Sequence, residues 1–307
     1  SQTSHLSHPL QLHPEHTAFL NQTGKMYTMP AFVKQNIPYT TAILNAEVYL
    51  RFMMGWDADF AERADNANLC VGIIGLGYVG LPTAIGFHDA GFTVWGVDVS
   101  QRTVDMVLQG KNPTGDADVD DIVPQPGAER WHITTSAAEA VPNCDVVLVT
   151  VPTPITHDLK PDLSYVEAAG RDVFKNLRKG ERTIVVLEST VYPGVTAQTW
   201  LPLIDELGLV IGEDVEIAYC PERFNPGDSA HGVRQVARVI GCSNPDIGHA
   251  LVSLYRKLTS EDVRYVGKLE VAEAAKVIEN VQRDINIALV LSLIHIRRCR
   301  RLKLCRS

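Results

Sequence analysis

Long apolar runs are missing from this sequence of 307 residues. No stretch reaches the ~18 consecutive apolar residues of a membrane-spanning helix, so we expect no membrane partner. Residues 1–20 also lack the basic start and apolar block of a secretory signal, which predicts a cytoplasmic protein. The six cysteines follow neither zinc-site nor disulfide-framework spacing. We therefore predict no metal site and a reducing compartment.

A surplus of basic residues is missing as well, because the formal net charge is −8. Proteins that bind nucleic acid usually present a basic face, so we expect no nucleic-acid partner. Residues 291–307 are the exception, with six basic residues and no acidic one. The chain is 45% apolar and 21% charged, which excludes general disorder and is enough for about two domains.

The sequence divides into segments of different character. Residues 1–53 are rich in His, Gln, Asn and Thr without a sustained period, so we expect an extension or upstream read-through, with Met54 as a possible start. From residue 70, apolar strands alternate with helices, which predicts a doubly wound parallel α/β sheet in residues 54–267. A long helix is expected within 268–290. The strands are expected at Cys70–Ile74, Thr93–Val97, Val146–Val151, Thr183–Leu187 and Val215–Tyr219, and the helices at Gln101–Leu108, Leu163–Leu177, Pro245–Leu258 and Leu269–Leu289.

A glycine-rich turn follows the first of these strands, in the order Gly75-Leu-Gly77-Tyr78-Val79-Gly80. A GxGxxG turn between a strand and a helix lets the backbone approach a pyrophosphate, which then lies at the helix N-terminus. Asp98 ends the second strand, where a carboxylate accepts hydrogen bonds from ribose hydroxyls and repels a 2′-phosphate. NAD is therefore favoured over NADP, although Arg102 nearby leaves NADP open. A plain glycine turn beside a surface Asp is the alternative.

Two further strand ends carry threonines, Thr153 in Val-Pro-Thr-Pro and Thr190 in Glu-Ser-Thr. Ligands of open α/β sheets bind outside the carboxyl ends of the strands, so both threonines are expected to face the cofactor crevice. Ordinary turn hydrogen bonding by their hydroxyls is an equally good interpretation of each alone.

The long helix places Lys276, Asn280 and Arg283 on one stripe, because at ~100° per residue Asn280 lies about 40° from Lys276 and Arg283 about 20° to its other side. A solvated helix face is the simpler interpretation of such a stripe. Upstream, Tyr-Cys-Pro-Glu222-Arg223-Phe224-Asn-Pro-Gly-Asp follows a strand end and is expected to form a ligand loop. A surface Glu222 paired with Arg223 is the alternative.

Together these blocks resemble the UDP-glucose/GDP-mannose 6-dehydrogenase family of nucleotide-sugar dehydrogenases. The matching segments are VGIIGLGYVGLPTA, GVD, VPTP, PDLSYVEAA, LESTVYPG, AYCPERFNPGD and EAAKVIENVQRDINIAL. Among subgroups, the chain looks most like enzymes that act on UDP-N-acetylglucosamine or UDP-N-acetylmannosamine. The resemblance implies NAD as cofactor, a UDP-sugar as substrate, a role in polysaccharide precursor supply and a homodimer formed through the long helix.

The resemblance also implies the reaction, a four-electron oxidation of the sugar C6 alcohol to a uronic acid with two NAD. Lys276 and Asn280 would steady the C6 oxygen, while Glu222 and Thr190 would position water and assist proton transfer. Arg223, Phe224 and Arg283 would join these residues in the substrate pocket. The residues implied to bind NAD are Gly75, Gly77, Tyr78, Val79, Gly80, Asp98, Arg102, Thr153 and Thr190.

The family's nucleophilic cysteine, in a Gly-Gly-His-Cys block, has no counterpart in this sequence, and neither does the second Rossmann-like, UDP-binding domain. Residues 291–307 begin with LSLIHI, which resembles a translated sequencing adapter, so we expect an artefact there and a C-terminally truncated enzyme unable to complete the oxidation. A genuine basic C-terminus is the alternative. Activity on UDP-glucose, a β-hydroxyacid dehydrogenase and a non-catalytic NAD-binding module are the alternative functions.

Overall fold

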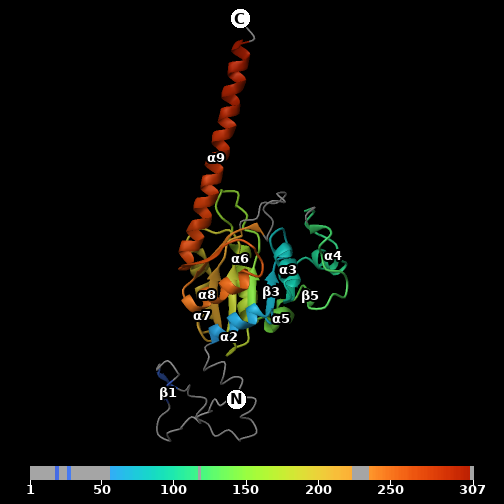
Figure 1. The fold of residues 1–307 in the computed structure, drawn as a ribbon, viewed down its shortest axis with the longest axis vertical. Coiled ribbons are helices and arrows are strands. Elements are labelled where there is room, and N and C mark those ends of the chain that lie inside the picture. The colour runs from blue at the N-terminus through green and yellow to red at the C-terminus, as the bar shows by residue number, and fades with distance from the viewer. Residues whose placement is uncertain (1–17, 21–25, 29–55, 117–118, 223–234, 305–307) are drawn as a thin grey trace, which may run out of the picture. The chain divides into compact units, whose positions relative to one another are not determined.

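The computed structural model describes residues 18–20, 26–28, 56–116, 119–222 and 235–304 (Figure 1). The chain forms two compact units, Ser1–Asp59 and Phe60–Ser307. In the first unit, β1 (Ala18–Leu20) pairs with β2 (Met26–Thr28) in antiparallel orientation. Most of residues 1–53 lie outside the described residues, and their origin as an extension or read-through stays a prediction.

The second unit is built on a sheet that has eight strands among the described residues, in the spatial order β10-β9-β8-β7-β6-β3-β4-β5. The six strands β3 to β8 all run parallel to one another. Several of them are buried along their whole length, as is typical of parallel sheets covered on both faces. The strands are β3 (Cys70–Ile74), β4 (Thr93–Val97), β5 (Trp131–Thr134), β6 (Val146–Val149), β7 (Thr183–Leu187), β8 (Val215–Tyr219), β9 (Arg238–Cys242) and β10 (Val263–Gly267).

The predicted doubly wound α/β sheet is confirmed, with one difference in strand direction. Strand β9 pairs with β8 in antiparallel orientation, at Ala218 opposite Cys242 and Tyr219 opposite Gly241. Strands β9 and β10 then run parallel to each other. The sheet is therefore mostly rather than wholly parallel, because its last two strands run against the other six.

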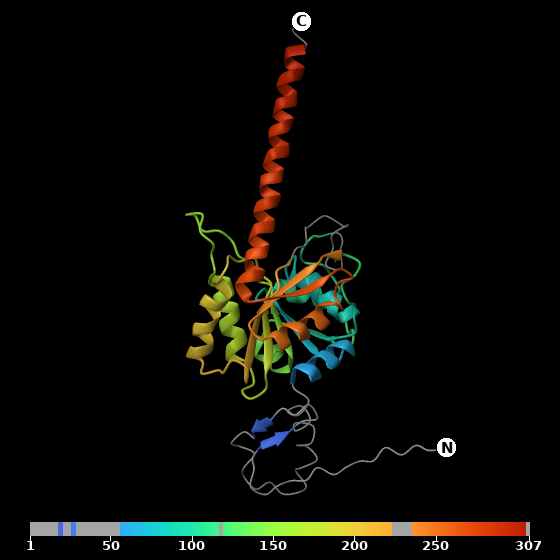
Figure 2. The same cartoon turned by 60° about the vertical axis from the view of Figure 1, so that its left-hand side comes forward.

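Helices cover both faces of the sheet (Figures 1 and 2). On one face, α6 (Ser164–Lys175) packs on α7 (Val195–Glu206), with Phe174 edge-on to Trp200 at 5.4 Å between ring centroids. On the other face, α3 (Gly80–Asp89) meets α8 (Pro245–Tyr255) through the rings of Phe87 and Tyr255. The remaining helices of the domain are α2 (Trp56–Asp65), α4 (Gln101–Leu108), α5 (Ala137–Ala140) and the 3-10 helix η3 (Val141–Asn143).

The long helix α9 (Leu269–Leu304) packs only its first turns against β8, β9 and β10. The turns that follow leave the domain (Figure 2). The helix was expected at Leu269–Leu289, but it continues without a break across residue 290 to Leu304. Leu, Ile and Arg are favourable or neutral in helices, which explains the extra length locally. The continuity of this helix does not decide whether residues 291–307 are an artefact, and that assignment stays a prediction.

Candidate active site

The glycine-rich turn joins β3 to α3, and two of its glycines are required by the fold itself. Gly75 has a φ of +96°, a conformation that L side chains rarely adopt. At Gly80, a Cβ atom would lie 1.8 Å from the carbonyl oxygen of Gly75 and 2.5 Å from Oγ1 of Thr150. The hydroxyl of Thr150 in turn donates to the Gly75 carbonyl oxygen at 2.8 Å. These contacts hold the start of α3 close against the end of β3.

The middle glycine, Gly77, is not required by a contact with any of the described residues. Among these residues, a Cβ atom there would meet no heavy atom within 4 Å, so the backbone borders open space. Beside it, α3 begins after Val79, and none of the described side chains caps its N-terminus. Free N–H groups and the positive end of the helix dipole favour an anion at this point. The turn therefore fits a pyrophosphate that approaches the backbone at Gly77, as NAD binding requires.

Asp98 follows β4 and connects it to the glycine-rich turn. Its carboxylate accepts a hydrogen bond from the Leu76 N–H at 2.8 Å and another from the Ser100 N–H at 2.9 Å. Each carboxylate oxygen retains a further acceptor site, which suits ribose hydroxyls next to the turn. Arg102 lies exposed in the first turn of α4, while Tyr78 is 53% exposed beside the turn.

The two strand-end threonines lie next to each other. Thr153 follows β6 and Thr190 follows β7, and the Thr153 hydroxyl donates to the Thr190 carbonyl oxygen at 2.9 Å. Both therefore lie at the carboxyl edge of the sheet, where the glycine-rich turn also begins. Both threonines were expected to face the cofactor crevice, and their contact with NAD stays a prediction.

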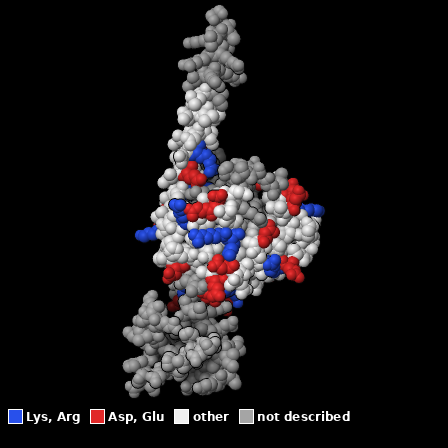
Figure 3. Space-filling model, viewed as in Figure 1, with Lys and Arg blue, Asp and Glu red and all other residues white. Residues whose placement is uncertain are grey.

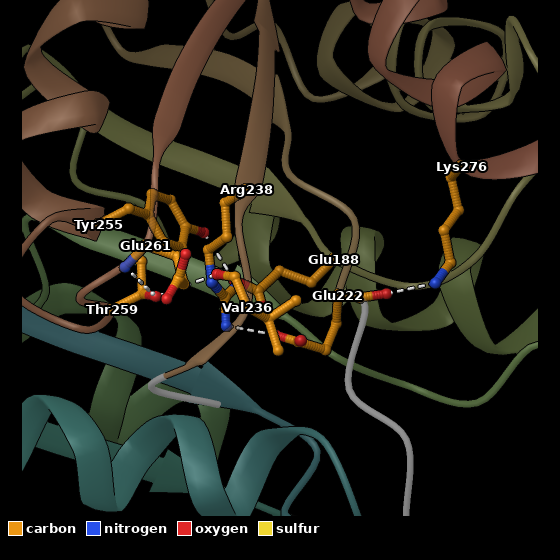
Figure 4. Close-up of polar contacts among 8 residues, drawn as sticks. All are labelled: Glu188, Glu222, Val236, Arg238, Tyr255, Thr259, Glu261 and Lys276. Carbon is orange, nitrogen blue, oxygen red and sulfur yellow. Dashed lines mark hydrogen bonds and ion pairs between the residues drawn. The ribbon is translucent and has the colours of Figure 1, made fainter. Parts of the chain in front are cut away.

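A buried ionic cluster lies beneath the same edge (Figure 4). The guanidinium group of Arg238, at the start of β9, is fully buried and pairs with the carboxylates of Glu188 and Glu222. Its centre lies 5.2 Å from the centroid of the Tyr255 ring. The Tyr255 hydroxyl donates to Glu188 at 2.6 Å. A buried cation is stable only when such partners compensate for its lost hydration, so the four side chains form one unit.

Burial determines the ionisation of this cluster. Loss of hydration raises the pKa of Glu188 to about 7, although the Arg238 charge and the Tyr255 hydroxyl oppose the rise. Burial also raises the pKa of the neighbouring Cys220 to about 12. A thiol with this pKa is protonated near neutral pH, which argues against Cys220 as a nucleophile.

The long helix brings Lys276 to this cluster. Lys276 is buried at 6% exposure, and its amine donates to the backbone carbonyl oxygen of Glu222 (Figure 4). Asn280 lies one turn further on and is half-buried, as is Arg283, which pairs with Glu279 at 3.5 Å. The predicted polar stripe therefore occupies the less exposed side of α9, whereas Ile278 and Ile285 are 67% and 61% exposed.

Glu222 is oriented differently from the expectation. Its carboxylate points to Arg238, and only its backbone carbonyl faces Lys276 (Figure 4). In this arrangement the carboxylate is held by the buried cation, so its expected role toward water stays a prediction. Arg223 and Phe224, which were expected in the substrate pocket, lie outside the described residues.

The sequence analysis did not identify four buried residues with polar contacts around the site, namely Arg238, Tyr255, Glu188 and Glu273. Arg238 interrupts the apolar run Val-Ala-Arg-Val-Ile-Gly-Cys, and a cation within a buried strand is a signal that could have been noticed. Glu188 was quoted only as part of a strand-end motif. Glu273 had no local signal, because its partners are 77 and 79 residues away.

The glycine-rich turn, the Asp after the second strand and the open α/β sheet define a dinucleotide-binding domain. The family model of the UDP-glucose/GDP-mannose dehydrogenase family, NAD binding domain, matches residues 69–259. The chain belongs to this family, and NAD is its cofactor.

Curated relatives with named substrates cover the same region. The UDP-N-acetyl-D-glucosamine 6-dehydrogenase of Pseudomonas aeruginosa is 40% identical over 227 residues, which are 74% of this chain and 52% of that protein. The UDP-N-acetyl-D-mannosamine dehydrogenase of Salmonella typhimurium is 38% identical over 234 residues, 73% of this chain and 54% of that protein. The chain thus spans about half the length of the curated relatives it matches.

Solved structures agree with this assignment. The UDP-D-ManNAc dehydrogenase of Pyrococcus horikoshii has a TM-score of 0.65 at 31% identity, covering 72% of this chain and 52% of that one. A GDP-mannose dehydrogenase from Pseudomonas aeruginosa, solved as a ternary complex, gives 0.65 at 32% identity, covering 71% and 51%. Within the described residues, no helix has the length and hydropathy needed to cross a membrane.

Proposed function

We propose that this chain supplies the NAD site and the substrate-facing lysine of a nucleotide-sugar 6-dehydrogenase. The proposed reaction converts the C6 alcohol of a UDP-N-acetylhexosamine to the uronic acid, with transfer of four electrons to two NAD. One observation carries the proposal. The amine of Lys276 reaches from α9 to residue 222, just beyond β8, at the sheet edge where the glycine-rich turn begins.

The chain's own residues suit the first oxidation step. NAD, when bound, accepts the hydride that leaves C6. Loss of this hydride needs the hydroxyl proton to pass to water and the charge developing on the C6 oxygen to be stabilised. Lys276 provides a cation on a rigid helix, held in place by the Glu222 carbonyl oxygen, and Asn280 adds an amide one turn on. Groups fixed in this way stabilise a developing charge with little reorganisation.

The second oxidation step needs a cysteine thiolate, which would add to the C6 aldehyde so that loss of a second hydride to NAD gives a thioester that water hydrolyses to the acid. Cys70 is the first residue of β3, and Cys144 lies just before β6. Both are therefore at the edge of the sheet opposite the cofactor turn. Cys220 is buried with its pKa raised to about 12, and Cys242 is buried in β9. The described cysteines therefore do not suit this step. We expect the 307-residue chain to bind NAD and to stop short of the acid.

The substrate assignment rests on named relatives. Relatives named as UDP-N-acetylglucosamine or UDP-N-acetylmannosamine dehydrogenases match at 38–40% identity, which supports an N-acetylated sugar. A UDP-glucose dehydrogenase of Pyrobaculum islandicum also matches in structure, at 30% identity and a TM-score of 0.62. UDP-glucose is therefore the substrate to compare directly.

The test combines NAD calorimetry with NADH absorbance after addition of UDP-N-acetylglucosamine, UDP-N-acetylmannosamine or UDP-glucose. We expect NAD binding and at most one NADH per N-acetylated sugar. Lys276→Met should retain NAD binding and lower the NADH rate by about 100-fold, the scale of losing one stabilising group in a transition state. Lys268→Met, an exposed lysine just before α9, is the matched control. NAD binding without NADH from any UDP-sugar would instead favour a non-catalytic module.

Self-association through α9 is a further part of the proposal. Apolar side chains beyond the domain are more than half exposed, including Ile278, Ile285 and Leu289, and the described part of this stretch shows few charges in Figure 3. A second copy of α9 would cover these side chains. Sedimentation should show a dimer, and Ile285→Glu should dissociate it, whereas Gln282→Glu nearby, also exposed, should change it less. A monomer at all concentrations would contradict the dimer.

A further inference from the structure

Glu273 lies in the first turns of α9 and is fully buried. Its carboxylate accepts three hydrogen bonds from the segment that opens α7. The Gly194 N–H donates to one oxygen. The Thr196 N–H and hydroxyl donate to the other, at 2.9 and 2.6 Å. A buried carboxylate that is satisfied by three donors holds both segments in one relative position.

Glu273 replaces the local cap that α7 lacks. The residue before this helix is Gly194, with a φ of +95° and no side chain to accept the first N–H groups. Helices usually receive this cap from a Ser, Thr, Asp or Asn at the same position in their own sequence. Here the acceptor comes from a helix 79 residues later, and its negative charge also favours the positive end of α7.

The two segments that Glu273 joins both lead to the proposed site. On one side, the loop 190–194 begins at Thr190, whose carbonyl oxygen accepts from Thr153 at the carboxyl edge of the sheet. On the other side, Lys276 lies three residues after Glu273, close to it on the helix surface. A movement of the loop would therefore be transmitted to the lysine through the Glu273 carboxylate.

We propose that Glu273 is a positioning residue that couples the cofactor-side loop 190–194 to Lys276 on α9. This inference rests on the proposed function only in taking Thr190 to lie beside NAD. The coupling has two consequences. Loosening the Glu273 contact should make Lys276 more accessible without NAD, and NAD binding should restrain Lys276 only while the contact is intact.

The experiment measures the rate at which an amine-reactive ester labels Lys276, read by peptide mass spectrometry, with and without NAD. Glu273→Gln removes the charge, and Thr196→Val removes one hydrogen bond from the opposite partner with little change of shape. Glu270→Gln, an exposed acid on the same helix, is the matched control. NAD affinity and the unfolding midpoint are measured for each variant.

Without NAD, both variants should label Lys276 about fivefold faster than the wild type, the lower end of typical coupling between sites. NAD should slow labelling in the wild type and in Glu270→Gln, and should lose this effect in both Glu273→Gln and Thr196→Val.

A lowered unfolding midpoint together with a wild-type labelling rate would show a purely structural role and overturn the proposal. NAD protection that persists in both variants would also overturn it, because direct shielding by NAD would explain it. A wild-type chain that fails to bind NAD would refute the proposed function, while labelling without NAD would still decide the role of Glu273.

Discussion

Gly77→Ala separates cofactor binding from folding within the glycine-rich turn. The added methyl group would meet no atom within 4 Å in the part of the chain that the structure describes, and the backbone at Gly77 does not lie in the left-handed region. Replacing glycine by alanine at such a position stabilises a fold by about 0.4–1 kcal/mol, because the unfolded chain loses freedom. The same methyl group would occupy the space through which a pyrophosphate approaches. Crowding of about 1–3 kcal/mol corresponds to roughly 5- to 150-fold weaker NAD binding.

Gly80→Ala is the informative comparison, because its Cβ would lie 1.8 Å from a backbone oxygen. The clash cannot be relieved by rotating a side chain, so α3 must move away from β3. We expect this variant to lose both stability, by about 1–3 kcal/mol or more, and NAD binding. Gly77→Ala should lose NAD binding alone.

Urea unfolding followed by tryptophan fluorescence gives the stability of each variant, and titration calorimetry gives its NAD affinity. Wild-type NAD affinity in Gly77→Ala would refute the reasoning, because the cofactor would then not approach the backbone at this point. Destabilisation of Gly77→Ala by more than about 1 kcal/mol would refute the claim that the space is open.

Two further predictions concern the buried cluster. Arg238→Met leaves Glu188 and Glu222 without their cation and should lower the free energy of unfolding by about 3–5 kcal/mol. The exposed Arg264, which pairs with Asp262, should tolerate the same change within about 0.5 kcal/mol, and equal losses in urea unfolding would contradict the argument. Burial raises the pKa of Glu188 from 4.5 to about 7, so the folded chain holds a proton that the unfolded chain has released in this range. The free energy of unfolding should therefore fall as the pH rises from 4.5 to 7, and Glu188→Gln should flatten this slope; an unchanged slope would assign it to other groups.

Much of the fold followed from local sequence. The bounds of β3, β4, β7, β8 and α4 were predicted to the residue. Strands of a parallel sheet that is covered on both faces are short apolar runs between turn residues, and such runs are visible without knowledge of their partners. Strands β5, β9 and β10 were missed. They carry polar residues such as His132, Arg238 and Arg264, which obscure the apolar pattern.

The residues of the predicted cofactor site could be identified in the sequence, because they are close together along the chain. Gly75, Gly80 and Asp98 lie within 24 residues, and their roles depend on backbone conformation and on strand ends that local patterns indicate. Lys276 was predicted by its spacing from Asn280 together with the family resemblance.

Only the tertiary structure decided which distant groups meet. Nothing local to Glu222 shows that its carboxylate pairs with Arg238 while its carbonyl oxygen accepts from Lys276. The same holds for Glu273, which accepts from the N–H of Gly194, the residue before α7 and 79 residues earlier in the chain. Helix and strand periods depend on neighbours within a few residues, whereas these contacts depend on how the chain packs. Burial then determines their chemistry, because the pKa of Glu188 departs from its ordinary value only once the fold removes its water.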